Sequence, residues 1–250
     1  MNSLPGGYKP SPDLLKDKVI VVTGAGSGIG RSAALSFASH GATVVLLGRT
    51  TQKLEAVYDE IEANGGPQPA IYPINFEGAC EKDYEDMAQA LFDEFGRLDG
   101  LLHNAAELGQ RTPLNNYSTD VWLQVMQVNV NAPFMLTKSM LPLLERAEQA
   151  SILFTGSSVG LQGRAYWGAY AASKAALENL MQTLAQELDG TCAVRANSVN
   201  PGATRTTMRA TAYPAENPAT VKSAEELMPL YLYLIGPDSN GVSGQQFGFK

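Results

Sequence analysis

The stretch VIVVTGAGSGIG, residues 19–30, decides the fold. Its first four residues are β-branched and apolar, which is typical of a strand buried on both faces. Glycines follow at once, and a helical pattern over Ile29–Ser39 begins directly after them. This order of strand, glycine-rich turn and helix predicts the first unit of a parallel sheet. The helix N-terminus behind such a turn can bind a phosphate.

The same alternation of apolar runs and helical patterns continues along the chain. It predicts an α/β fold: a Rossmann-type, doubly wound parallel sheet of about seven strands with helices on both faces, in a single domain. A flexible arm rich in Gly, Pro and Ser is expected over residues 1–12, and the domain over residues 13–250. Further strands are predicted at 43–47, 70–74, 98–103, 151–155, 193–199 and 245–249, and further helices at 51–63, 81–95, 120–146, 170–188 and 224–235.

Composition excludes several function classes. The chain has 250 residues, with only 2 His and 2 Cys, so a zinc, iron–sulfur or disulfide framework lacks ligands and no metal is expected. The net charge of -7 and the lack of a basic run argue against nucleic acid as a partner. No apolar stretch is long enough for a membrane span, and no signal peptide is recognisable, so a cytoplasmic protein is expected.

The glycine turn and the end of the second strand predict a dinucleotide site. The second strand ends Leu47-Gly48-Arg49, where an NAD site usually has a carboxylate for the ribose 2′-OH. A guanidinium at Arg49 can instead bind a 2′-phosphate through two hydrogen bonds, which favours NADP(H) over NAD(H). The alternatives are an ordinary turn between strand and helix and a solvated surface arginine.

A general acid or base for catalysis must be a residue other than the two histidines. One tyrosine has a lysine placed to make it suitable. Among 10 tyrosines, Tyr170 has a lysine four residues later, Lys174, on the same face of a predicted helix. A nearby ammonium lowers the pKa of a phenol and makes it a usable general acid or base. Polar residues also follow three strands, at Asn104, Ser157 and Asn200, where a parallel sheet binds ligands.

Together these motifs resemble the short-chain dehydrogenase/reductase family in order and spacing. The resemblance runs from about Leu15 to the C-terminus. The segments around Asn129, before Tyr170 and around Pro229 are similar to the bacterial YciK-like oxidoreductases, a subgroup without an assigned substrate. The motifs that carry the resemblance are Thr23–Gly30, His103–Ala106, Asn129, Ser157, Tyr170 with Lys174, and Pro201–Thr206.

The resemblance implies a role for each matching residue. Tyr170 would give a proton to the carbonyl or take it from the alcohol, and Lys174 would hold the nicotinamide ribose and lower the pKa of Tyr170. Ser157 would orient the carbonyl, and Asn129 would support a proton-relay water. The implied cofactor-binding residues are Thr23, Gly24, Ser27, Gly28, Ile29, Gly30, Arg49, Asn75, Asn104, Ala105, Tyr170, Lys174, Pro201, Gly202, Thr204 and Thr206.

The chain departs from the family pattern at a few positions. His103 and Ala106 replace the first Asn and the last Gly of an Asn-Asn-Ala-Gly motif, and His103 is interpreted as a satisfied strand-end residue rather than a catalyst. Asn75 stands where an Asp commonly faces the adenine. The chain also ends in residues 241–249 without the Asp-Gly-Gly of many relatives.

The substrate pocket is expected between Ser157 and Tyr170 and in the irregular, Pro-containing segment 206–223, which is a candidate lid. Tyr166 and Trp167 would stack on a flat substrate or pack at a subunit interface. Arg164, Arg205 and Arg209 are interpreted as solvated, with an anion site as the alternative. The candidate pocket residues are Gln162, Tyr166, Trp167 and Met208.

The sequence therefore predicts an NADP(H)-dependent oxidoreductase that interconverts a small-molecule carbonyl and an alcohol by hydride transfer. The family resemblance adds a homodimer or homotetramer, formed through the helices at 120–146 and 170–188. A catalytically silent NADP(H)-binding or redox-sensing protein on the same fold is the alternative. A His-dependent hydrolase is disfavoured, because neither histidine lies near a nucleophile elbow.

Overall fold

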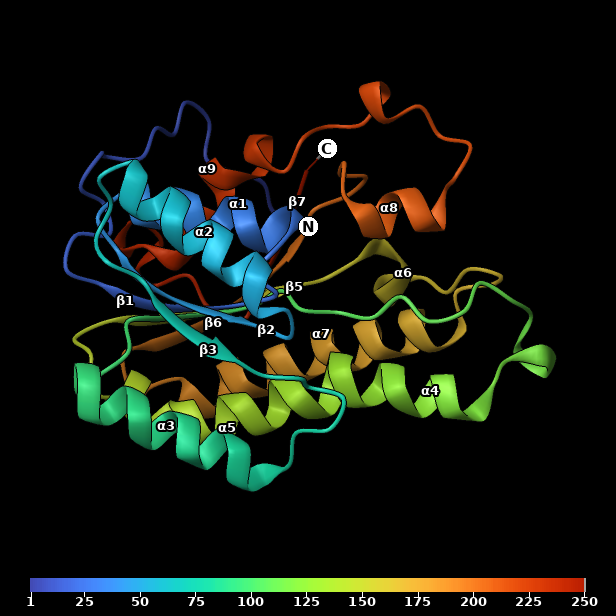
Figure 1. Ribbon diagram of the computed structural model, residues 1–250, viewed down its shortest axis with the longest axis horizontal. Helices are drawn as coiled ribbons and strands as arrows, with labels where there is room; N and C mark the ends of the chain where they lie inside the picture. Colours follow the sequence, from blue (N-terminus) through green and yellow to red (C-terminus); the bar gives the residue numbers. More distant parts are fainter. Residues whose placement is uncertain (250) are drawn as a thin grey trace.

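The computed structural model describes residues 1–249, and one parallel sheet with helices on both faces organises them (Figure 1). The strand order is β3-β2-β1-β4-β5-β6-β7, and each neighbouring pair is parallel. This confirms the predicted fold class. The strands are β1 (Val19–Thr23), β2 (Thr43–Gly48), β3 (Ala70–Pro73), β4 (Gly100–His103), β5 (Ala150–Thr155), β6 (Val194–Asn200) and β7 (Gln246–Gly248).

The strand order reverses between β1 and β4, which lie side by side although two strands separate them in sequence. At such a switch point the connections leave in opposite directions and open a crevice beyond the carboxyl ends of the strands. The glycine turn after β1 and the segment after β4 both begin at this crevice. Several of the predicted cofactor residues therefore lie at the crevice that this strand order creates.

Helices cover both faces because the strands are apolar on both. Val19 and Val21 face one core, whereas Ile20 and Val22 face the other. The first core contains α3 (Glu81–Phe95), α5 (Ala132–Leu144) and α7 (Gly168–Leu188), and the second contains α1 (Gly28–Ser39), α2 (Thr51–Ala63) and α9 (Met228–Ile235). These two groups lie on opposite sides of the sheet (Figure 1).

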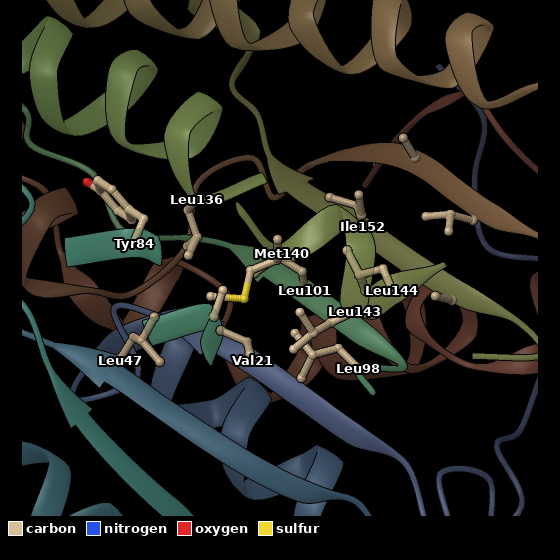
Figure 2. Close-up of a cluster of buried hydrophobic side chains, with 14 of the residues drawn as sticks. Val21, Leu47, Tyr84, Leu98, Leu101, Leu136, Met140, Leu143, Leu144 and Ile152 are labelled. Atoms are coloured by element: carbon tan, nitrogen blue, oxygen red, sulfur yellow. The ribbon is translucent and has the colours of Figure 1, made fainter. Parts of the chain in front are cut away.

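The packing of the first core is shown in Figure 2. Val21 and Leu47 from neighbouring strands meet Leu136 and Met140 of α5, and all four side chains are fully buried. Burial of one such side chain stabilises the fold by about 1.5–3 kcal/mol. The core holds the sheet rigid, and the strand ends that carry the polar motifs are fixed with it.

The predicted long helix 120–146 is interrupted by a wider turn. The structure has α4 (Thr119–Met126), a π-helical turn (Gln127–Asn131) and then α5. Pro133 lacks an N–H, so the α-helical hydrogen bond to the carbonyl of Asn129 cannot form. In the turn just before it, the backbone N–H of Ala132 donates to the carbonyl of Gln127, five residues back. Such turns are frequent at functional sites.

The segment 206–223 is more regular than its sequence indicated. It contains α8 (Thr207–Ala212) and a short 3-10 turn (Pro218–Thr220). A short helix, α6 (Ser158–Leu161), follows β5, and α9 is preceded by a 3-10 turn (Glu225–Leu227) within the predicted helix 224–235. Two further 3-10 turns are Leu114–Asn116 and Pro237–Ser239.

The N-terminal residues make specific contacts with the end of the sheet. Asn2 forms a bridge to Phe247 in β7, and the Tyr8 hydroxyl donates to Asp238 at 2.8 Å. The predicted flexibility of residues 1–12 concerns motion and stays a prediction. Over residues 1–249, no helix combines the length and apolarity that a membrane crossing needs.

Candidate active site

The glycine turn after β1 is packed against the segment after β4. Gly24 has a φ of +67°, and a Cβ there would lie 3.1 Å from the Cα of Ala105. A Cβ on Gly30 would lie 2.3 Å from the carbonyl oxygen of Gly24 and 2.6 Å from the amide nitrogen of Asn104. Larger residues cannot occupy either position without moving the backbone. The chain can therefore approach a ligand closely at this turn.

Thr23 is buried and fixes the segment after β4. Its hydroxyl oxygen accepts hydrogen bonds from the backbone N–H groups of Asn104, at 2.9 Å, and Ala105, at 3.0 Å. The same hydroxyl donates to the carbonyl of Leu102 at 3.1 Å. Thr23 thus positions Asn104 and Ala105, but it does not itself line either of the two cavities described next. Gly30 packs against Gly24 and also lies outside both linings.

Two cavities lie at the carboxyl ends of the strands and share the glycine turn. The first, the Arg49 pocket, measures about 210 Å³ and is open to solvent. Arg49, Lys53 and Asn75 line it beside the glycine turn. The Arg49 guanidinium donates to the Glu107 carboxylate at 2.7 Å, and the Arg49 side chain is 62% exposed. A cation is thus present at the end of β2, as predicted, with an anion beside it.

The second cavity, the Tyr170 pocket, measures about 250 Å³ and brings together Ser157, Tyr170 and Lys174. Ser157 lies two residues after the end of β5, and the other two side chains come from α7. The Lys174 ammonium donates to the carbonyl of Thr155 at 2.8 Å and lies 5.6 Å from the centroid of the Tyr170 ring. One cavity therefore holds a hydroxyl, a phenol and an ammonium.

Burial shifts both titratable groups of this trio. Desolvation raises the pKa of Tyr170 to about 12, although the Ser157 side chain acts in the lowering direction. Desolvation also lowers the pKa of Lys174 to about 8. The sequence predicts a lowered Tyr170 pKa. The structure corrects this, because desolvation outweighs the other contributions and the ammonium is bonded to Thr155.

Asn129 lies in the π-helical turn, and its buried side chain acts as a clamp. Its amide oxygen accepts from the N–H of Glu107 at 2.7 Å, and its amide nitrogen donates to the carbonyl of Glu107 and to the hydroxyl of Ser173, both at 2.9 Å. Asn129 thus joins the segment after β4 to α7, one residue before Lys174. The predicted water relay stays a prediction.

His103 is a satisfied strand-end residue, as its position indicated. Its Nε2 lies 2.8 Å from the Thr137 hydroxyl, and its ring stacks on Phe154 at 4.7 Å between centroids. Burial, aided by the charge of Lys174, lowers the pKa of His103 to about 3. The imidazole is therefore neutral at physiological pH and fills the core below the site.

The predicted substrate residues separate into two pairs. Trp167 and Met208 line the Tyr170 pocket, together with Leu108 and Ala212. Gln162 and Tyr166 lie outside its lining and are exposed, Tyr166 by 54%. The structure therefore does not bring Gln162 and Tyr166 to the cavity, because the turn between α6 and α7 directs them to solvent.

Most of the predicted cofactor residues do meet in the two cavities. Sequence reasoning missed Glu107 and Lys53 in the Arg49 pocket and Arg111 above Trp167. Only proximity in the fold identifies them, since nothing local marks these charges. The predicted residues that line one or both cavities are Gly24, Ser27, Gly28, Ile29, Arg49, Asn75, Asn104, Ala105, Tyr170, Lys174, Pro201, Gly202, Thr204 and Thr206.

Comparison with known proteins gives one consistent result. Residues 18–217 match the family model for short chain dehydrogenase. The uncharacterized oxidoreductase YciK of Escherichia coli K12 is 49% identical over 240 residues, 96% of this chain and 94% of that protein. A structure described as a short chain dehydrogenase, from Pseudomonas syringae, has 58% identity and a TM-score of 0.95, and covers 96% of this chain and 98% of its own.

A second structural relative carries a ligand. It is described as a short chain dehydrogenase from Shigella flexneri complexed with NADP, with 48% identity and a TM-score of 0.93. The match covers 95% of this chain and 99% of that one. The likeness therefore extends over both cavities and over the elements that form them.

Proposed function

This chain belongs to the short-chain dehydrogenase family, and on that premise we propose that it is an NADP(H)-dependent oxidoreductase that interconverts a carbonyl and an alcohol. The observation that carries the proposal is the meeting of Ser157, Tyr170 and Lys174 in one cavity that also contains the glycine turn. A proton donor and a dinucleotide cradle thus share a single site. Neither histidine takes part in it.

The residues of the two cavities fit NADP(H). The N-terminus of α1 follows the glycine turn, so its free backbone N–H groups suit a pyrophosphate. Arg49 and Lys53 supply positive charge where a 2′-phosphate would be recognised, and the related structure from Shigella flexneri is complexed with NADP. When bound, NADPH supplies the hydride that reduces the carbonyl carbon and leaves as NADP⁺.

The chain's own residues handle the proton. In reduction, the Tyr170 hydroxyl donates its proton to the carbonyl oxygen, while the Ser157 hydroxyl donates a hydrogen bond to the same oxygen. A Tyr170 pKa of about 12 keeps that proton in place at neutral pH, so the group is ready as an acid. The Lys174 ammonium compensates the phenolate that forms. In oxidation the proton moves in the opposite direction.

The test removes one oxygen atom. Tyr170→Phe should lower the rate of NADPH oxidation with a carbonyl panel by about 10²–10⁴-fold, because general acid catalysis is lost. The dissociation constant of NADPH, measured by fluorescence titration, should stay within about twofold, because no charged contact changes. Tyr166→Phe, an exposed tyrosine outside the cavity, is the matched control and should leave the rate unchanged.

The same experiment distinguishes the proposed oxidoreductase from a catalytically silent NADP(H)-binding protein. A silent NADP(H) sensor on this fold binds NADPH in both proteins and oxidises it in neither. Turnover in the unmodified protein that is retained by Tyr170→Phe would instead contradict the role of Tyr170. Turnover that disappears with this single oxygen supports the proposal.

A further inference from the structure

One part of the lining of the Tyr170 pocket is apolar. Leu108, Trp167, Met208 and Ala212 line it, and they belong to a small hydrophobic cluster separate from the two cores of the sheet. Trp167 is only 8% exposed. Aromatic and aliphatic walls of this kind favour an apolar ligand, and a tryptophan favours a flat one.

Arg209 is a cation of this pocket, but it is already paired. Its guanidinium donates two hydrogen bonds to the Glu216 carboxylate, at 2.7 and 2.6 Å, and lies 3.8 Å from the Tyr213 ring centroid. Such a bidentate pair is among the strong polar interactions of proteins. An anionic substrate would have to displace Glu216 to reach Arg209.

Arg111 and Lys174 also have partners within the protein. Arg111 donates to the carbonyl of Ala212 at 2.8 Å and lies over Trp167, 4.1 Å from its ring centroid. Lys174 bonds to the carbonyl of Thr155. Arg164 and Arg205, the other candidate anion ligands, are exposed and lie outside the lining. The lining, within the part of the chain that the structure describes, also contains no Asp or Glu for a substrate ammonium.

These contacts connect three segments of the chain next to the pocket. Arg111 comes from the segment after β4, Trp167 precedes α7, and Arg209 and Tyr213 belong to α8 and its end. The Arg111 guanidinium lies 4.1 Å from the ring centroid of Trp167 and 5.2 Å from that of Tyr213. Three segments far apart in sequence are therefore tied together by cation–π contacts.

We propose that the substrate is an uncharged carbonyl compound whose body is an apolar, flat ring, held between Trp167 and Met208 with its carbonyl at Ser157 and Tyr170. This inference rests on the proposed function and adds the substrate class to it. A carboxylate or phosphate on the ring would lie among apolar side chains with its charge uncompensated, which disfavours its binding.

The experiment compares two aldehydes of similar shape, 4-methylbenzaldehyde and 4-carboxybenzaldehyde, at saturating NADPH. We expect kcat/KM to be at least about 30-fold higher for the methyl compound. Equal values, or a preference for the carboxylate, would overturn the inference. Trp167→Ala should lower kcat/KM for the methyl compound about tenfold, mostly through KM, because it removes ring contact area.

A second variant tests the charge argument without reshaping the apolar wall. Glu216→Gln frees the Arg209 guanidinium, so kcat/KM for the carboxylate should rise about three- to tenfold while that for the methyl compound is unchanged. Glu187→Gln, an exposed glutamate of α7, is the matched control and should change neither. A Glu216→Gln enzyme with an unaltered preference between the two aldehydes would contradict the assignment of Arg209 as a neutralised cation.

Binding separates this inference from the proposed function. The Tyr170→Phe protein with NADPH bound should bind the methyl aldehyde at least about tenfold more tightly than the carboxylate by calorimetry. If no carbonyl is turned over but this preference is found, the oxidoreductase proposal fails and the ligand class stands. If turnover occurs and the preference is reversed, the ligand class fails alone.

Discussion

The Arg49 pocket and the Tyr170 pocket lie side by side at one sheet edge, share Gly24, Ser27, Ala105 and Ala106, and differ in how their charged groups are placed. In the first, a 62% exposed guanidinium has one partner, and that partner is itself partly exposed. In the second, the ammonium is buried and its hydrogen bond goes to backbone. The difference teaches where each kind of recognition is placed. Under the proposed function, exposed charge selects the cofactor in the Arg49 pocket, and apolar contact beside a positioned proton donor serves the substrate in the Tyr170 pocket.

The largest effect is expected in the Tyr170 pocket. Lys174→Met should lower kcat by about 10²–10⁴-fold, because the phenolate that forms on Tyr170 loses its compensating charge. Lys53→Met is the matched substitution in the Arg49 pocket and should leave kcat unchanged while it weakens NADPH binding about threefold. Steady-state kinetics measures both. Equal losses of kcat in the two variants would contradict the assignment of the catalytic charge to the Tyr170 pocket.

Arg49→Ala should have the next largest effect, and only on one cofactor. Affinity for NADPH should fall about ten- to hundredfold, since a charge-assisted pair of hydrogen bonds to the 2′-phosphate is lost. Affinity for NADH should change by less than about twofold, because NADH has no phosphate there. Fluorescence titration measures both. Arg31→Ala, which breaks an ion pair with Glu60 on the outer side of α1, is the control.

The pH dependence distinguishes the two pockets as well. Because burial lowers the pKa of Lys174 to about 8, about nine-tenths of the ammonium is charged at pH 7 and about one-tenth at pH 9. Carbonyl reduction should therefore fall about tenfold between pH 7 and pH 9 as that charge is lost. Tyr170, with a pKa of about 12, keeps its proton over this range.

The ratio of NADPH to NADH affinity should stay constant from pH 7 to pH 9, because the Lys174 ammonium lies in the other pocket. A reduction rate that is flat across this range would contradict the role of the Lys174 charge. If the NADPH to NADH affinity ratio fell together with the reduction rate, the titration of Lys174 would affect both pockets.

Glu107→Gln is expected to give the smallest effect. Glu107 is the partner of Arg49, so its carboxylate competes with a 2′-phosphate and repels it. Its neutralisation should raise NADPH affinity about two- to fivefold, the range of an exposed ion pair. NADH affinity should be unaffected. Weaker NADPH binding in this variant would mean that Glu107 holds Arg49 in its binding position.

Sequence reasoning predicted the parts of the site that depend on local rules. Tyr170 and Lys174 share a helix face because they are four residues apart, and Ser157 follows a strand whose end must lie at the same sheet edge. The strands were recognisable because they are apolar on both faces. These relations need only chain periodicity and the parallel topology.

The remaining features depend on contacts between distant segments. Glu107 meets Arg49 across 58 residues, and Arg111 meets Ala212 across 101. Whether Tyr166 reaches the cavity depends on the path of the turn between α6 and α7. The direction of the Tyr170 pKa shift depends on burial. The π-helical turn at Asn129 had only a weak local signal in Pro133, which lacks the N–H for one α-helical hydrogen bond, because Pro142 lies inside α5 without such a turn.

The most direct test of this division is the salt dependence of kcat/KM for each reactant in the unmodified enzyme. Between about 0.05 and 0.5 M NaCl, kcat/KM for NADPH should fall several-fold, because screening weakens an exposed charge contact. The value for a neutral carbonyl substrate at saturating NADPH should stay within about 1.5-fold, because the Tyr170 pocket recognises it without charge. Parallel losses for both reactants, or no loss for NADPH, would contradict the account.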